Sequence, residues 1–89
     1  MRFGYDPAKS VANKAKHGID FEEAQALWND GDAVTQSVTA SAEPRFLVTG
    51  KIGERLWTAV VVYRGERIRI ISVRRARKHE TEKYLGRGV

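Results

Sequence analysis

The side chains best suited to chemistry in this sequence are one histidine and a pair of adjacent arginines. His17 follows Lys16 and precedes Gly18. A histidine titrates near neutral pH, which makes it a candidate general acid or base, although a histidine at a helix end can equally serve as a C-cap. Arg74 and Arg75 follow an apolar segment, and arginine presents a planar fork of donors that matches phosphate. These residues predict contact with a phosphate-bearing substrate.

Other polar residues allow weaker predictions. Glu80 and Tyr84 recur at helical spacing after Ala76, but the competing interpretation of Glu80 is a surface ion pair with Arg77. His79 lies in a highly charged stretch and is interpreted as a surface residue. Two histidines without suitably spaced acids do not form a metal site, and no metal or other cofactor is predicted. The sequence also lacks a Gly-rich phosphate loop and a nucleophile elbow.

The arginine pair must be positioned by the stretch from Arg67 to Tyr84, which begins as a β-branched strand and continues as a short polar helix. Side chains alternate along a strand. If Ile68 and Ile70 face the core, Ser72 and Arg74 are predicted to emerge on the same side at the edge of the core.

The histidine must be positioned by a helix that begins at Asp6-Pro7. Aspartate caps free N–H groups, and proline suits the first helical position. The helix is predicted to run to about His17 and to end at Gly18. Its apolar residues form a thin stripe at helical spacing, consisting of Ala8, Val11, Ala12 and Ala15.

A second helix is predicted over about Phe21 to Asn29. Asp20 and Glu23 fit a capping box at its start. The residues after the turn at 29–32 read mainly as strands, over 33–39, 45–51, 56–63 and 67–73. With a short extended opening at 2–5, the predicted order is β-α-α-β-β-β-β-α. This is one α+β domain over 1–89, an antiparallel meander with two N-terminal helices and one C-terminal helix on one face.

Composition narrows the function classes. The chain has 89 residues, no cysteine and a net charge of +5. Seven cations and one acid lie between Arg64 and Lys78, which favours a polyanion or an acidic protein as partner. No apolar run is long enough to span a membrane, and the first residues lack the apolar region of a signal peptide. The cytoplasm is therefore the expected compartment.

Two motifs together resemble the BrnT family of type II toxins. The first consists of Phe3, Tyr5, Asp6, Lys9, Asn13, Lys16, His17, Gly18, Phe21 and Ala24. The second runs from Arg69 to Ala76 and continues with Glu80 and Tyr84, while Arg45 with Gly50 fits the strand motif between them. Val73 stands where alanine is common in the family, at a position interpreted as packing.

The resemblance implies a RelE-like α+β fold and a ribonuclease toxin that blocks translation. It also implies a BrnA-type antitoxin that neutralises the toxin in a hetero-oligomer. The operator DNA of the shared operon would be contacted only through that antitoxin. No membrane partner is implied.

We therefore predict metal-independent RNA cleavage, in which the 2′-hydroxyl attacks the adjacent phosphate. Arg74 and Arg75 are assigned to the scissile phosphate, and Arg45 supports them. His17 is the leading acid or base, with Lys16 beside it. Glu80 and Tyr84 would orient the arginines or stack a base. The alternative is a non-catalytic basic interaction module.

The shared-site hypothesis makes a geometric prediction. His17 and Arg74 should lie on the same face of the fold, although they are far apart in sequence.

Overall fold

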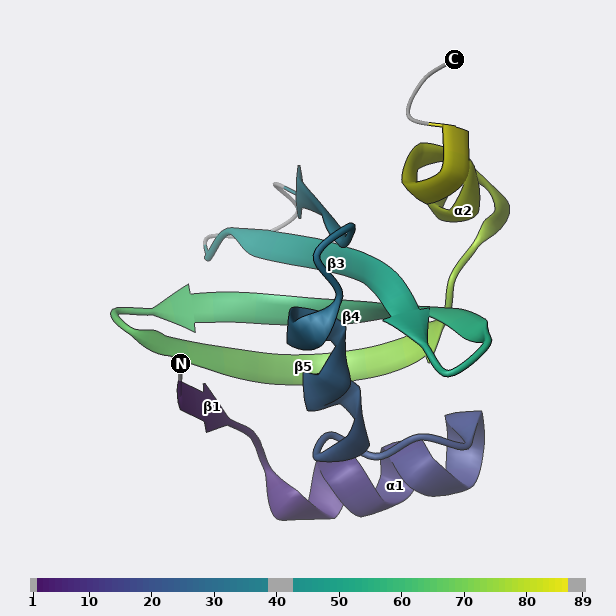
Figure 1. Ribbon diagram of the computed structural model, residues 1–89. Helices are drawn as coiled ribbons and strands as arrows, with labels where there is room; N and C mark the ends of the chain where they lie inside the picture. Colours follow the sequence, from purple (N-terminus) through teal and green to yellow (C-terminus); the bar gives the residue numbers. More distant parts are fainter. Residues whose placement is uncertain (1, 39–42, 87–89) are drawn as a thin grey trace.

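A five-stranded sheet in the order β1-β5-β4-β3-β2 organises the protein (Figure 1). The computed structural model describes residues 2–38 and 43–86. The elements in chain order are β1 (Arg2–Gly4), α1 (Pro7–His17), the 3-10 helix η1 (Glu23–Asn29), β2 (Val34–Val38), β3 (Arg45–Ile52), β4 (Arg55–Arg64), β5 (Arg67–Arg75) and α2 (Lys78–Gly86). None of the helices within these described ranges has the length and apolar character needed to cross a bilayer.

The sheet is mixed because of its first strand. β1 pairs in parallel with β5, with Arg2 opposite Arg67 and Phe3 opposite Ile68. The other neighbouring strands pair antiparallel. The predicted antiparallel sheet is therefore wrong. A strand of three residues carries too little alternation to specify a partner, and its partner lies more than sixty residues further along the chain.

The second predicted N-terminal α-helix is instead a 3-10 helix, so the predicted fold class is wrong on this point as well. The capping box does form: the Glu23 N–H donates to Asp20 Oδ1 at 2.7 Å, and the Asp20 N–H donates to Glu23 Oε1 at 3.0 Å. The buried side chains of Phe21, Ala24 and Leu27 are spaced three apart, which matches the three residues per turn of a 3-10 helix. The tighter helix keeps all three against the sheet.

Helix α1 begins and ends where the sequence predicts. The Asp6 carboxylate accepts the Ala8 N–H at 2.9 Å, and Pro7 occupies the first helical position. Gly18 ends the helix with φ at 84°. This left-handed conformation suits glycine, which has no Cβ to clash.

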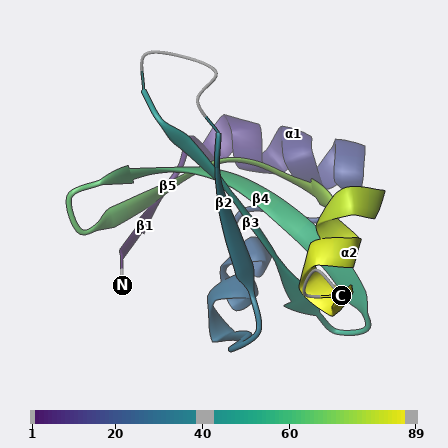
Figure 2. The same ribbon diagram turned by 90° about the horizontal axis from the view of Figure 1, so that it is seen from above.

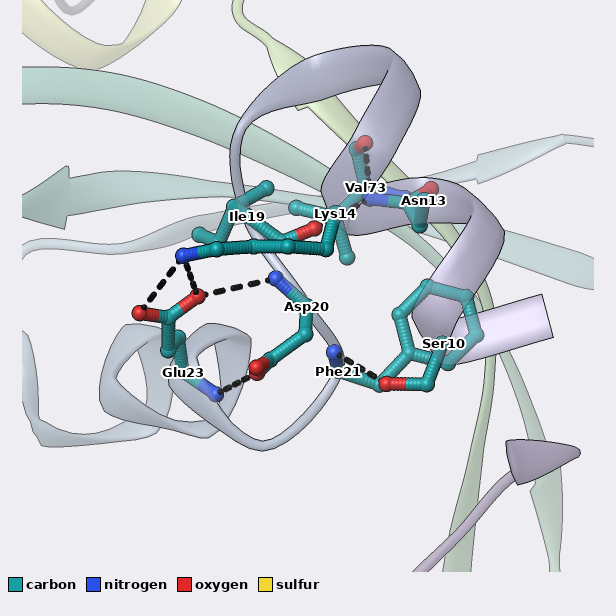
Figure 3. Close-up of polar contacts among 8 residues, drawn as sticks. All are labelled: Ser10, Asn13, Lys14, Ile19, Asp20, Phe21, Glu23 and Val73. Atoms are coloured by element: carbon teal, nitrogen blue, oxygen red, sulfur yellow. Dashed lines mark hydrogen bonds and ion pairs between the residues drawn. The ribbon is translucent and has the colours of Figure 1, made fainter. Parts of the chain in front are cut away.

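The predicted apolar stripe is not the buried side of α1. Val11 is 71% exposed, whereas Ser10 and Asn13 are buried. The Asn13 side-chain amide donates to the Val73 carbonyl at 2.9 Å, and its oxygen accepts the Val73 N–H at 3.2 Å (Figure 3). Helix α1 therefore lies along the outer edge of β5, where Asn13 takes the place of a neighbouring strand. Because the contact is with main chain, the buried residue is polar.

The core lies between η1 and one face of the sheet, where it gathers Ile19, Phe21, Ala24, Leu27, Val48, Trp57, Ala59, Val61, Ile68, Ile70 and Val73. Helix α2 packs at the sheet end that carries the β3–β4 hairpin (Figure 2). It contacts Thr58 and Arg74, which alternate with the core residues Ala59 and Val73. Helix α2 is therefore on the opposite face, and the prediction that all helices cover one face is wrong.

A β-bulge at Ile71 changes the phase of β5. Val61 pairs with Ile70, but Val60 pairs with Ser72, which leaves Ile71 as the extra residue. The predicted alternation therefore fails beyond Ile70. Val73 joins Ile70 on the core face, and Ser72 lies on the other.

Candidate functional site

Adjacent residues of a strand project to opposite faces, and the bulge decides which face Arg74 and Arg75 each take. Arg74 lies on the α2 face, where its guanidinium forms a two-point ion pair with Glu80: Nη1 lies 2.8 Å from Oε1, and Nη2 lies 2.9 Å from Oε2. The side chains are 19% and 0% exposed, respectively. Arginine pairs of this kind combine strength with fixed geometry. Arg74 is thus held by its own protein.

Glu80 accepts two further hydrogen bonds. Thr58 Oγ1 donates at 2.9 Å, and the Arg77 main-chain N–H donates at 2.8 Å. The buried hydroxyls of Thr58 and Thr49 are 2.8 Å apart, which extends the network to β3. The Arg74 guanidinium, more than any other group, lowers the pKa of Glu80 to about 2. The competing interpretation of Glu80 as a surface partner of the Arg77 side chain is wrong.

Tyr84 fixes the next turn of α2. Its hydroxyl donates to Asp30 Oδ2 at 2.8 Å, which ties α2 to the end of η1. Asp30 also accepts the N–H groups of Lys51 at 2.8 Å and Asp32 at 2.9 Å. These main-chain donors, Lys51 first, lower the pKa of the Asp30 carboxyl. Glu80 and Tyr84 therefore hold α2 on the sheet.

Arg75 has a different environment. It is exposed, and its guanidinium carbon lies 5.5 Å from the centroid of the Trp57 ring, its cross-strand partner on β4. This is a cation–π arrangement, which orients the arginine without neutralising its charge. No hydrogen bond or ion pair within residues 2–38 and 43–86 occupies the Arg75 guanidinium.

Trp57 also lines a cavity of about 450 Å³, which we call the helix-end pocket. Its wall is formed by Gly18 and Ile19 at the end of α1 and by Gly53 and Arg55 of the β3–β4 hairpin. Arg55 is exposed and adds a second cation at the rim. The end of α1 and the hairpin therefore line one pocket, and Trp57 links this pocket to Arg75 of β5.

His17 and Lys16 belong to this end of the molecule, because Gly18 follows them directly and lines the pocket. His17 is half-buried and Lys16 is exposed. The Asn13 amide donates to the Ile19 carbonyl at 2.7 Å and so holds the turn after His17 against β5.

The segment after this turn is also tightly held (Figure 3). Ser10 Oγ accepts the Phe21 N–H at 2.9 Å, and the Lys14 ammonium lies 2.8 Å from Glu23 Oε1. The Lys14 contact lowers the pKa of Glu23 and raises that of Lys14. Glu23 and Glu54 both line the helix-end pocket, and Glu23 is already paired with Lys14.

The seven predicted site residues thus fall into three places. Lys16, His17 and Arg75 lie at or beside the helix-end pocket. Arg74 lies against α2, which carries Glu80 and Tyr84. Arg45 is the first residue of β3, at the sheet end opposite the β3–β4 hairpin.

The geometric prediction joining His17 to Arg74 gains no support. Figure 1 shows α1 beside β5 and α2 beyond β3, with the strands between them. The Arg74 guanidinium turns to α2, and no hydrogen bond or ion pair among the described residues links it to His17. The contacts instead bring the end of α1 close to the site of Arg75.

Three contributors were missed from the sequence. Trp57 lies on the strand predicted over 56–63 and Arg55 directly precedes it, but nothing local indicates which cation faces that tryptophan. Asn13 was noticed only as part of a motif. Its spacing of four residues from His17 is a usable signal, since both fall on one side of a helix.

A protein-family model matches most of the chain. The family model described as "Ribonuclease toxin, BrnT, of type II toxin-antitoxin system" matches residues 5–80. That range contains α1, the strands β2 to β5 and the first turn of α2, and hence the whole helix-end pocket. No curated protein sequence matches the chain significantly.

Proposed function

The chain belongs to the BrnT family of ribonuclease toxins of type II toxin-antitoxin systems, and we propose that it cleaves RNA at the helix-end pocket without a metal ion. The observation that carries this proposal is the meeting of the His17-Gly18 turn with Trp57, on which Arg75 stacks. A histidine can transfer the protons of phosphodiester cleavage, and an arginine without a protein carboxylate partner can stabilise the developing negative charge.

The proposed reaction uses the RNA's own nucleophile. A general base removes the proton of the 2′-hydroxyl, whose oxygen forms a bond to the adjacent phosphorus. The bond from phosphorus to the 5′-oxygen breaks, and a general acid protonates that oxygen. The products are a 2′,3′-cyclic phosphate and a 5′-hydroxyl end. The protein needs only to position the groups, transfer protons and stabilise negative charge.

The polar residues at or beside the pocket have separate roles in this scheme. His17 transfers protons, and Lys16 adds positive charge beside it. Arg75 binds the non-bridging oxygens of the scissile phosphate, held in direction by Trp57. Arg55, on the pocket wall, is a second cation for the phosphate.

Arg74 and Glu80 are proposed to act as positioning residues. Their ion pair fixes the end of β5, and Arg75 is the last residue of that strand. Holding the strand in one conformation keeps Arg75 over Trp57 and reduces the entropy lost when RNA binds. Tyr84 supports the same arrangement through α2.

The proposed biological role follows the family. Cleavage of RNA in the cytoplasm blocks translation, and a cognate BrnA-type antitoxin binds the protein and neutralises it. The net charge of +5 supports both an RNA substrate and an acidic protein partner. Operator DNA is contacted through the antitoxin.

The test is cleavage of a defined RNA by the purified protein in excess EDTA. We expect cleavage with 2′,3′-cyclic phosphate ends, and no cleavage when the nucleotide 5′ to the scissile bond carries 2′-deoxyribose. Replacement of His17 by alanine should lower the rate by about 10²–10⁴-fold. The exposed His79 supplies the matched control, since His79→Ala should cleave normally.

Two results contradict the proposal. Activity that EDTA abolishes and a divalent cation restores refutes metal independence. RNA binding without cleavage, together with no growth arrest on expression, assigns the chain to the non-catalytic alternative. Restoration of growth by the co-expressed antitoxin tests neutralisation separately.

A further inference from the structure

A row of arginines crosses the sheet at the end opposite the helix-end pocket. Arg67 is the first residue of β5. It lies opposite Arg2 of β1 on one side and opposite Arg64 of β4 on the other. Residues in register on adjacent strands project to the same face, with Cβ atoms about 5 Å apart. We call Arg2, Arg64 and Arg67 the arginine row. Figure 1 shows β1 beside β5 near the β4–β5 hairpin, away from the end of α1.

The arginine row lines its own cavity. A space of about 380 Å³ is bounded by these three arginines and Glu66. Every lining residue is charged, and the three arginines are exposed. The cavity therefore offers three guanidinium groups and one carboxylate, and no aromatic or aliphatic residue lines it.

The arginine row is electrostatically unfavourable on its own. Like charges directly opposite each other on neighbouring strands destabilise a sheet. One acid, Glu43, lies 3.2 Å from Arg64. Within residues 2–38 and 43–86, no carboxylate forms an ion pair with Arg2 or Arg67. A row of three like charges in which one arginine has an acidic partner breaks a local stability rule, and such a site indicates a function.

We propose that the arginine row binds backbone phosphates of the RNA, at a distance from the bond that is cleaved. This inference rests on the proposed ribonuclease function. Arginine's planar fork binds phosphate oxygens in pairs, and three neighbouring guanidinium groups suit consecutive phosphates. The row reads no base, so it adds affinity without sequence preference.

The chemistry favours RNA over a protein partner. Protein interfaces have a core of aromatic and aliphatic residues that excludes water. The arginine row has no such residue in its cavity. Binding of phosphates, in contrast, needs only cations placed at the surface.

The position of the row makes its effect depend on RNA length. Arg67 and Arg75 are the first and last residues of β5, which puts them about 25 Å apart and on opposite faces of the strand. An RNA of a few nucleotides cannot reach both places. A longer RNA can occupy the helix-end pocket and continue to the row.

The first experiment measures binding of an RNA about 30 nucleotides long. Each nucleotide 5′ to a cleavable bond carries 2′-deoxyribose, so that the nucleophile is absent and the RNA is not cleaved. The variant carries Arg2→Gln, Arg64→Gln and Arg67→Gln. The control carries Lys9→Gln, Lys78→Gln and Lys83→Gln, which removes the same charge from exposed positions. Loss of three phosphate contacts should reduce the slope of log affinity against log salt by about 2 in the row variant. An unchanged slope, or an equal change in the control, overturns the proposal.

The second experiment compares cleavage of a four-nucleotide and a 30-nucleotide substrate by the row variant. We expect about a tenfold or greater rise in KM for the long RNA, with kcat and the short substrate unaffected. Equal loss on both substrates overturns the proposal, because the row would then act on the pocket. Lost antitoxin affinity with normal RNA binding assigns the row to the protein partner and also overturns it.

These outcomes separate the row from the proposed function. If the unmodified protein does not cleave RNA but the row variant still loses salt-dependent RNA binding, the ribonuclease proposal fails and the phosphate site stands.

The thermal stability of the protein gives an independent readout. Removing one repulsive charge with Arg67→Thr should raise Tm by about 1–5 °C, whereas a structural role for the row predicts a fall.

Discussion

Arg74 and Arg75 are adjacent in the sequence, but they lie in two regions with opposite properties. Arg74 is part of a buried network under α2, where each oxygen of Glu80 is occupied. Arg75 lies on the other face, exposed and stacked on Trp57. The charge of Arg74 is neutralised within the protein and stabilises the fold, whereas the charge of Arg75 remains available to a ligand. Adjacent cations of one type therefore need separate functional assignments.

The comparison also separates two kinds of positioning. The Arg74 network is rigid because its donors and acceptors satisfy one another. The helix-end pocket has exposed cations instead. Asn13, outside its lining, holds the surrounding segments in place by hydrogen bonds to β5 and to Ile19 in the turn after α1. A site that binds RNA needs such support without neutralisation of its own cations.

The largest effect should come from removing Glu80. Glu80→Ala leaves the Arg74 guanidinium without a partner in a largely buried position, and α2 loses its main polar contacts. We expect a loss of about 3–5 kcal/mol in the free energy of unfolding. Denaturant unfolding measures this, with Glu82→Ala as the exposed control on the same helix. A loss below about 1 kcal/mol would mean that the network does not stabilise the fold.

The two arginines should separate in a paired substitution. Arg75→Ala should lower RNA cleavage by about 10²–10³-fold, because one donor to the developing phosphate charge is lost. Its unfolding midpoint should change little, since the side chain is exposed. Arg74→Ala should mainly reduce stability. A folded Arg75→Ala protein with full activity would remove Arg75 from the mechanism.

Acid should weaken the Arg74 region. The pKa of Glu80 falls from 4.5 to about 2 on folding, so the carboxylate contributes stability above the unfolded pKa and loses it as the pH falls through the folded pKa. The shift corresponds to about 3 kcal/mol. Between about pH 6 and pH 2, the Tm of the unmodified protein should therefore fall more steeply than the Tm of Glu80→Gln. Parallel curves would contradict this account.

The smallest effect should come from the turn beside the pocket. Gly18 has φ at 84°, so Gly18→Ala places a Cβ in a left-handed conformation at a cost of about 1–2 kcal/mol. No atom outside the neighbouring residues lies within 4 Å of that Cβ position, so backbone strain is the main cause. Gly18→Asn should cost less, because asparagine tolerates this conformation. Equal losses in unfolding free energy would argue for a different cause.

Local sequence signals predicted where several helices begin and end. The caps at Asp6 and Gly18 depend on residues next to the helix and were confirmed. The capping box at Asp20 formed as well, but the spacing of its buried residues gave a 3-10 helix. The pairing of β1 with β5 was not predictable, because a short strand carries no information about a partner more than sixty residues away.

The sequence by itself determined the family, the cationic surplus and the presence of an arginine pair at the end of a strand. The tertiary structure decided which arginine is free. The extra residue Ile71 inverts the alternation of β5, so Arg74 turns to Glu80 and Arg75 turns to Trp57. A bulge forms between paired strands, and its position depends on the register with β4. No pattern within β5 alone specifies that register.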